Sequence, residues 1–164
     1  MSPEVRDFVR RALAAGPPPR HVVEFGSRDV AGGTVRGLFP DVERYHGVDL
    51  VDGPSVDVVA DAATWRPVAP PDLVVCCEVL EHTPDGPAIL ANAHAILRRG
   101  GRLVVTAAST GRAPHSAVDG GPLREGEYYR NVEPPELVSW LGAFTLEVFE
   151  FHAERGDIYA VARR

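Results

Sequence analysis

The chain contains no lysine, and all 17 of its strongly basic residues are arginine. Without lysine there can be no Walker-type phosphate-binding lysine, no Schiff-base lysine and no lysine general base. Cysteine is also scarce, since Cys76 and Cys77 are the only two and lie side by side. Adjacent residues on a strand point to opposite faces, so this pair cannot jointly close a metal site. We interpret both as buried structural thiols.

Long apolar runs are missing as well. No stretch approaches the ~20 residues that a membrane span needs, and the N-terminus lacks the apolar core of a signal peptide. The net charge is −6, so no overall basic field attracts nucleic acid. We therefore expect a cytoplasmic protein with neither membrane nor nucleic-acid partners. The abundance of arginine, alanine, valine, glycine and proline is typical of a GC-rich bacterial genome.

A length of 164 residues fits one domain with a proper hydrophobic core. We predict a single domain over residues 1–164, acting as a monomer or homodimer. Residues 1–20 are predicted to form an N-terminal helix, with Ser2 as its cap, and then a proline linker. The polar, glycine- and proline-rich stretch 109–131 is long for a connection in a compact domain, which predicts a substrate-binding loop.

Three short valine-rich runs in the first half of the chain each end in an acidic residue. If the runs are parallel strands of one sheet, their carboxylates line up along its carboxyl edge, where open α/β sheets bind ligands. After the first run, Gly26 lets the backbone approach a ligand closely. Only residues 50–55 separate the second run from the third, which is too short for a helical crossover. The runs span residues 21–24, 45–49 and 56–61, and their acids are Glu24, Asp49 and Asp61.

The remaining hydrophobic patterns alternate between strands and helices. A continuous apolar run predicts a strand that is buried on both faces, and a helix follows it with apolar residues on one side. Two alternating runs near the end of the chain, joined by a tight turn, predict a hairpin. In chain order these elements are a short helix over 29–39, a strand over 72–77, a helix beginning at Asp85, a strand over 102–107, a short helix from Pro134, and hairpin strands over 144–151 and 157–163.

Several short segments carry a resemblance to one family. Residues 22–27 combine an acid with a glycine turn, residues 48–50 end the second run, and residues 78–82 read Glu-Val-Leu-Glu-His. Together with Asp61 and the joint over 97–105, they occur in the order and spacing of class I S-adenosylmethionine-dependent methyltransferases. The third segment is similar to the type 11 and quinone C-methyltransferase group. The resemblance covers almost the whole chain and implies an α/β, Rossmann-like, doubly wound sheet of seven mostly parallel strands with a C-terminal antiparallel hairpin.

The resemblance also implies a cofactor, S-adenosyl-L-methionine, with S-adenosyl-L-homocysteine as the product. In this family the second acid, here Asp49, holds the ribose hydroxyls, and an acid at the position of Asp61 contacts the adenine amine. An acidic rim that includes Glu24 favours a sulfonium and an ammonium group over a pyrophosphate. The predicted cofactor-binding residues are Glu24, Phe25, Gly26, Ser27, Asp49, Leu50, Asp61, Ala62, Glu78 and Val79.

The predicted activity is methyl transfer to a small-molecule acceptor. If the acceptor must lose a proton, His82 is the candidate base because the ordinary pKa of histidine is near ~6.5. Glu81 could orient His82 or act in its place. No set of histidine, cysteine and acidic residues has metal-ligand spacing, so no metal is expected. Residues in or beside the long loop are the candidate acceptor contacts, namely His115, Tyr128, Tyr129 and Arg130.

Two other functions remain open from the sequence. One is an NAD(P)-dependent oxidoreductase on a Rossmann fold, although the strict Gly-x-Gly-x-x-Gly pattern for pyrophosphate is missing. The other is a catalytically silent cofactor-binding module, because Ser27 and Arg28 stand where the family often has a second glycine. Purely structural roles also remain open. Asp61 can cap the turn over 62–65 instead of binding the cofactor, and the loop 109–131 can be an exposed connection that does not contact an acceptor.

Overall fold

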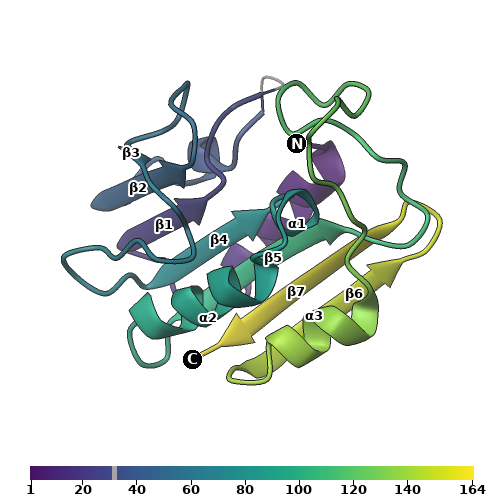
Figure 1. Cartoon of the computed structure of the whole chain (residues 1–164). Helices are drawn as coiled ribbons and strands as arrows, with labels where there is room; N and C mark the ends of the chain where they lie inside the picture. Colours follow the sequence, from purple (N-terminus) through teal and green to yellow (C-terminus); the bar gives the residue numbers. More distant parts are fainter. Residues whose placement is uncertain (31–32) are drawn as a thin grey trace.

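One sheet of seven strands organises residues 1–30 and 33–164, the part of the chain that the computed structural model describes (Figure 1). The strands are β1 (His21–Phe25), β2 (Arg44–Asp49), β3 (Val58–Val59), β4 (Leu73–Cys77), β5 (Arg102–Ala108), β6 (Thr145–His152) and β7 (Asp157–Arg163). Their order is β3-β2-β1-β4-β5-β7-β6. Strands β1 to β5 pair in parallel, whereas β7 is antiparallel to both of its neighbours. The predicted fold class and its C-terminal hairpin are confirmed.

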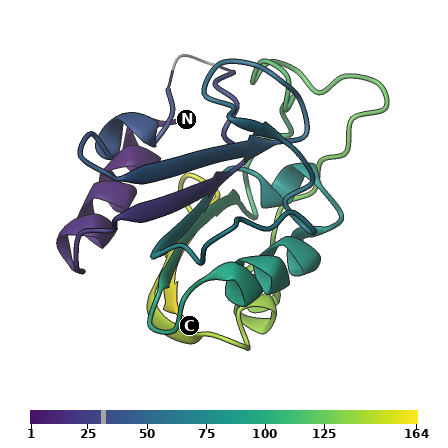
Figure 2. The same cartoon turned by 90° about the vertical axis from the view of Figure 1, so that its left-hand side faces the viewer.

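Helices cover both faces of the sheet (Figure 2). Helix α1 (Pro3–Ala14) lies on one face, and α2 (Gly86–Ile96) and α3 (Pro134–Trp140) lie on the other. Helix α1 begins as its sequence predicts, because the Ser2 hydroxyl accepts a hydrogen bond from the Val5 N–H at 3.3 Å. The part of the chain described here contains no helix long and apolar enough to cross a membrane.

The core has one apolar layer on each side of the sheet. Successive strand residues contribute to opposite layers, because side chains alternate along a strand. Cys76 packs with the α2 and α3 layer, and Cys77 packs with the α1 layer. Both thiols are free and buried, as expected for structural cysteines.

The carboxyl ends of the central strands coincide. In the parallel register, Phe25 of β1 pairs with Val48 of β2 on one side and with Cys76 of β4 on the other. The residues that follow these strands therefore meet at one edge of the sheet. The loop over 109–131 lies at the same end of the molecule, toward which the arrows of β1 and β4 point (Figure 1).

Two predicted elements differ from the structure. The described part of the predicted helix 29–39 contains only a 3₁₀ turn, η1 (Arg36–Leu38), and Gly32 of that prediction lies outside the described residues. Strand β3 is shorter than the predicted 56–61. Its start is lost because the Asp57 carboxylate accepts the Gly47 N–H at 2.7 Å and pairs with Arg36 at 2.8 Å. The connection between β2 and β3 is irregular, as predicted.

A buried acid lies within β1. Glu24 is only 2% exposed, and its carboxylate accepts a hydrogen bond from the Tyr45 hydroxyl at 2.7 Å. Burial raises the pKa of Glu24 from 4.5 to about 7, although the Tyr45 hydrogen bond opposes the change. Folding therefore takes up a proton at this site wherever the pH lies between these two values.

This proton uptake predicts how stability depends on pH. Below the pKa of Glu24 in the unfolded chain, this side chain is neutral in both the folded and the unfolded state, so folding buries no charge here. Between about pH 4.5 and about pH 7 the unfolded chain ionises this acid while the folded protein keeps it protonated, so the free energy of unfolding falls by about 3 kcal/mol over this range. In Glu24→Gln the side chain cannot ionise, and Tyr45 keeps an acceptor. Urea denaturation across pH should therefore show the variant gaining about 3 kcal/mol on the wild type between about pH 5 and about pH 8.

The exposed Glu125→Gln provides a matched control, because it removes one carboxylate without altering a buried group. We expect its stability to follow that of the wild type across the same pH range. Parallel curves for Glu24→Gln and the wild type would show that Glu24 is not held in its neutral form by the fold.

Candidate functional site

A cavity of about 1110 Å³ opens at the carboxyl edge of the sheet. This volume lies just above the ~300–1,000 Å³ typical of small-molecule sites. The segments that follow β1, β2, β3 and β4 form one side, and the long loop forms the other. The wall includes Gly26, Asp49, Leu50, Val51, Asp61, Ala62, Glu78, Val79, His82, Arg112 and His115.

The turn after β1 must be made by glycine. Gly26 has a φ of +73°, and a Cβ at this position would lie 2.2 Å from Cγ2 of Val79. Its N–H donates to the Val48 carbonyl at 2.9 Å, which ties the turn to β2. The site wall is therefore bare main chain at this point, as the sequence predicts for close approach of a ligand.

Asp49 presents a fixed carboxylate at the end of β2. One of its oxygens accepts the Arg28 N–H at 3.1 Å, and the other accepts the Val51 N–H at 3.0 Å. These bonds orient the group without using all its acceptor positions. Beside it, Leu50 and Val51 are 68% and 53% exposed. The cavity thus combines a positioned hydrogen-bond acceptor with an apolar surface.

Asp61 also lies in the wall, and it caps the turn that follows it. Its carboxylate accepts the Ala63 N–H at 2.8 Å, so the local role left open by the sequence is present. That bond uses one acceptor position of the carboxylate and leaves others for a ligand. Ala62 is held in place because Asn92 of α2 donates to its carbonyl at 2.8 Å.

Three residues of the predicted first motif do not reach the cavity. Glu24 faces Tyr45 on the α1 side of the sheet, and Phe25 is fully buried in the opposite core layer. Ser27 is 1% exposed, and its hydroxyl has no hydrogen-bond partner. The acids in the wall on this side are therefore Asp49 and Asp61, without Glu24.

Two glutamates follow β4 in a strained segment. Glu78 has a φ of +57°, a conformation that costs a non-glycine residue about 1–3 kcal/mol and is concentrated at functional sites. Its carboxylate lies in the wall and accepts the Thr106 hydroxyl at 2.9 Å. Glu81, in the 3₁₀ turn η2 (Leu80–His82), is fully buried, and neither of its carboxylate oxygens has a hydrogen-bond partner. Burial and the nearby Glu78 raise the pKa of Glu81 well above its ordinary value.

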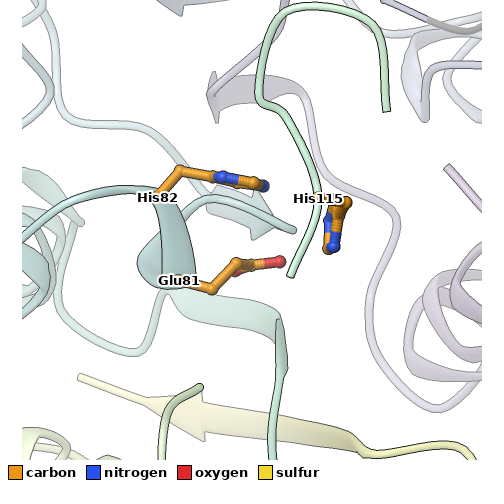
Figure 3. A group of neighbouring side chains, drawn as sticks. All are labelled: Glu81, His82 and His115. Carbon is orange, nitrogen blue, oxygen red and sulfur yellow. The ribbon is translucent and has the colours of Figure 1, made fainter. Parts of the chain in front are cut away.

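His82 and His115 lie close to Glu81 (Figure 3). Their rings form an aromatic group with that of Tyr129. The two imidazole ring centres are 4.9 Å apart, and the Tyr129 ring lies 5.4 Å from His82 and 4.9 Å from His115. Burial lowers the pKa of His82 to about 4, and His115 adds to this effect. His82 is consequently a neutral imidazole near pH 7, able to accept a proton or a ligand.

The other predicted acceptor contacts lie outside the wall. The Arg130 guanidinium pairs with the Glu136 carboxylate of α3 at 3.0 Å. The main-chain N–H of Arg130 donates to the Glu81 carbonyl at 2.8 Å. Tyr128 is 39% exposed and is not among the cavity residues. Of the four residues predicted in this region, His115 lines the cavity and Tyr129 packs behind it.

Two arginines of the cavity wall were not predicted. Arg112 pairs with the buried Asp157 of β7 at 2.5 Å and approaches Glu78 to 3.9 Å. Arg28 donates to the Ala117 carbonyl of the long loop at 3.2 Å. In a chain with 17 arginines, nothing in the sequence distinguishes these two, because only the tertiary fold brings their partners together.

Comparisons with known proteins agree with this geometry. A ubiquinone biosynthesis O-methyltransferase of Xylella fastidiosa (strain M23) is 33% identical over 130 residues, which cover 70% of this chain and 52% of that protein. The chain thus spans about half the length of the curated relatives it matches.

Solved structures show the same fold at low sequence identity. The 1,6-didemethyltoxoflavin-N1-methyltransferase of Burkholderia thailandensis, crystallised with S-adenosylhomocysteine, is 21% identical with a TM-score of 0.69, over 99% of this chain and 77% of that one. The [4+2]-cyclase SpnF is 14% identical with a TM-score of 0.73, over 98% and 80% of the two chains.

A family model described as "Methyltransferase domain" matches residues 1–149. This match covers the cavity, the strand-end acids and the segment from Glu78 to His82. The chain therefore belongs to the methyltransferase-domain family and has the fold of class I S-adenosylmethionine-dependent methyltransferases.

Proposed function

We propose that this protein transfers a methyl group from S-adenosyl-L-methionine to a small-molecule acceptor. The observation that carries the proposal is the fixed Asp49 carboxylate beside exposed Leu50 and Val51, in the same cavity as His82. A nucleoside needs this combination, because its ribose donates hydrogen bonds while its base covers apolar surface. The curated relative is an O-methyltransferase, and the Burkholderia enzyme holds S-adenosylhomocysteine.

The residues present fit this cofactor. It supplies a methyl group on a positively charged sulfur, together with an ammonium group. Carboxylates of Asp49 and Asp61 lie in the wall and favour such charges over a pyrophosphate, whereas Glu78 accepts the Thr106 hydroxyl and faces Arg112. The bare main chain at Gly26 leaves room for close contact. We assign Asp49 to the ribose hydroxyls and Asp61 to the adenine amine.

The chain's own contribution to the reaction is mainly orientation. Holding an acceptor atom in line with a methyl carbon can account for ~7–11 kcal/mol of the barrier. The long loop, through residues 112–117 and 120–122, closes the acceptor side of the cavity and limits water. The neutral His82 can accept a proton from an acceptor that must lose one.

Further proposals concern the setting of this activity. We propose that residues 1–164 act as one domain, in the cytoplasm, as a monomer or homodimer. The two alternative functions, an NAD(P)-dependent oxidoreductase and a catalytically silent cofactor-binding module, have less support. A nicotinamide dinucleotide would bring its pyrophosphate to an acidic wall, and the fold of the cyclase SpnF supports a silent or different activity only at the level of architecture.

Removal of the Asp49 charge should weaken cofactor binding. Asp49→Asn loses an anionic acceptor that is worth about 1.5–3 kcal/mol, so the Kd for S-adenosylhomocysteine should rise about 10- to 100-fold. Titration calorimetry measures both values. The control is Asp52→Asn, because Asp52 is an exposed acid of the same segment that does not line the cavity. The absence of binding by the wild type, or equal binding by Asp49→Asn, would count against the proposal.

Removal of the His82 imidazole should affect turnover and leave cofactor binding in place. His82→Asn is expected to lower kcat by about 10²- to 10⁴-fold, the range for losing a proton-transfer group. The assay is transfer of labelled methyl to a panel of hydroxylated and N-heterocyclic small molecules, with His94→Asn as the control. His94 packs against Phe144 and does not line the cavity. Tight cofactor binding without transfer to any panel member would favour the silent module.

A further inference from the structure

Three side chains with metal-ligating atoms come together beside the cavity, and two of them, His82 and His115, line its wall (Figure 3). Glu81 and His82 come from η2, and His115 comes from the long loop. One ligand atom from each residue can be chosen so that all lie within 4.8 Å of one another. Among the residues that the structure describes, no other trio of histidine, cysteine and acidic side chains comes as close.

The Glu81 carboxylate has no partner of its own. The residue is 0% exposed, and neither oxygen forms a hydrogen bond. Burying an ionised carboxylate without a partner is costly, so such groups are usually paired or bound to a metal. Without a ligand, burial and the neighbouring Glu78 keep the Glu81 carboxyl in its neutral form, and a bound metal ion would replace its proton.

The hydrogen bonding of His115 leaves its other nitrogen available. Its Nδ1 lies 3.1 Å from the Ala113 carbonyl oxygen, which can only accept, so Nδ1 carries the proton. In the neutral ring, Nε2 then has the free lone pair. A backbone carbonyl that holds the second ring nitrogen is the usual support of a metal-bound histidine. His82 likewise has a buried Nδ1 with no hydrogen-bond partner.

We propose that Glu81, His82 and His115 bind one divalent transition-metal ion, such as Zn²⁺, Mn²⁺ or Fe²⁺. Two imidazoles and one carboxylate are a donor set that suits these ions, whereas Ca²⁺ and Mg²⁺ prefer oxygen ligands. Metal–ligand bonds of about 2.1 Å place two ligands at most about 4.2 Å apart. The observed limit of 4.8 Å exceeds this spacing by about 0.6 Å, so binding requires the side chains to move closer together.

The site would leave coordination positions open toward the cavity, because His82 and His115 both line its wall. This part of the inference rests on the proposed function. A metal with open positions binds and acidifies an acceptor hydroxyl, which releases its proton to water. The oxygen lone pair then forms the bond to the methyl carbon while the carbon–sulfur bond breaks and the sulfur keeps the electron pair. The acceptor class is therefore an oxygen nucleophile. With the metal bound, His82 serves as a ligand, and the proton-accepting role given to it above applies to the metal-free protein.

The test is direct metal binding to the whole chain without cofactor. After treatment with a chelator, the protein is titrated with Co²⁺ under visible absorption spectroscopy and with Zn²⁺ in a calorimeter. We expect one ion per chain and a visible Co²⁺ band. Glu81→Gln and His115→Gln should each raise the Kd at least about tenfold, since even the groups that support metal ligands are worth about 10- to 100-fold.

The matched control is His46→Gln. His46 Nδ1 lies 3.0 Å from His21 Nε2, which makes this pair the alternative place for a metal to bind. The control should bind Co²⁺ as the wild type does. The proposal is overturned if the wild type gives neither band nor heat, if Glu81→Gln and His115→Gln bind unchanged, or if His46→Gln abolishes binding.

Two further comparisons keep the result interpretable. Because Glu81 is in the core, His115→Gln tests the site independently if the Glu81 variant does not fold. Asp49→Asn should retain metal binding, which separates failure of the metal site from failure of the proposed cofactor site. With transfer activity in hand, chelation should reduce the rate and Zn²⁺ or Mn²⁺ should restore it.

Discussion

The parallel register of β1 between β2 and β4 is the constraint on which the rest of the structure depends. Main-chain hydrogen bonds fix Phe25 against Val48 on one side and Cys76 on the other. Apolar layers on both faces hold this register, because a shift by one residue would exchange the two sets of side chains. Every strand-end feature of the cavity follows from it, including the Gly26 turn and the Asp49 carboxylate.

Much of this arrangement could be predicted from the sequence. The alternation of strands and helices, the hairpin and the acids at strand ends are local signals, and the correct fold class followed from them together with the family resemblance. The direction of Glu24 could not be predicted, because a strand buried on both faces has no polar side to orient it. The loss of the start of β3 also had no local signal, since the contacts of Asp57 with Arg36 and Gly47 come from distant parts of the sequence.

The cluster of Glu81, His82 and His115 shows the same limit. Glu81 and His82 belong to a recognisable segment, so their importance was predicted from sequence. His115 comes from a loop without helix or strand periodicity, and no spacing rule links it to that segment. The burial of Glu81 without a partner is likewise a tertiary property. The fold thus supplies the third member of the cluster and the burial of its carboxyl group.

The hydrogen bond from the Arg130 main-chain N–H to the Glu81 carbonyl ties the end of the long loop to η2. His115 lies on the same loop, which also lines the cavity. An ion bound by all three side chains would cross-link that loop to η2, so under the proposal metal binding would be thermodynamically linked to the order of the loop.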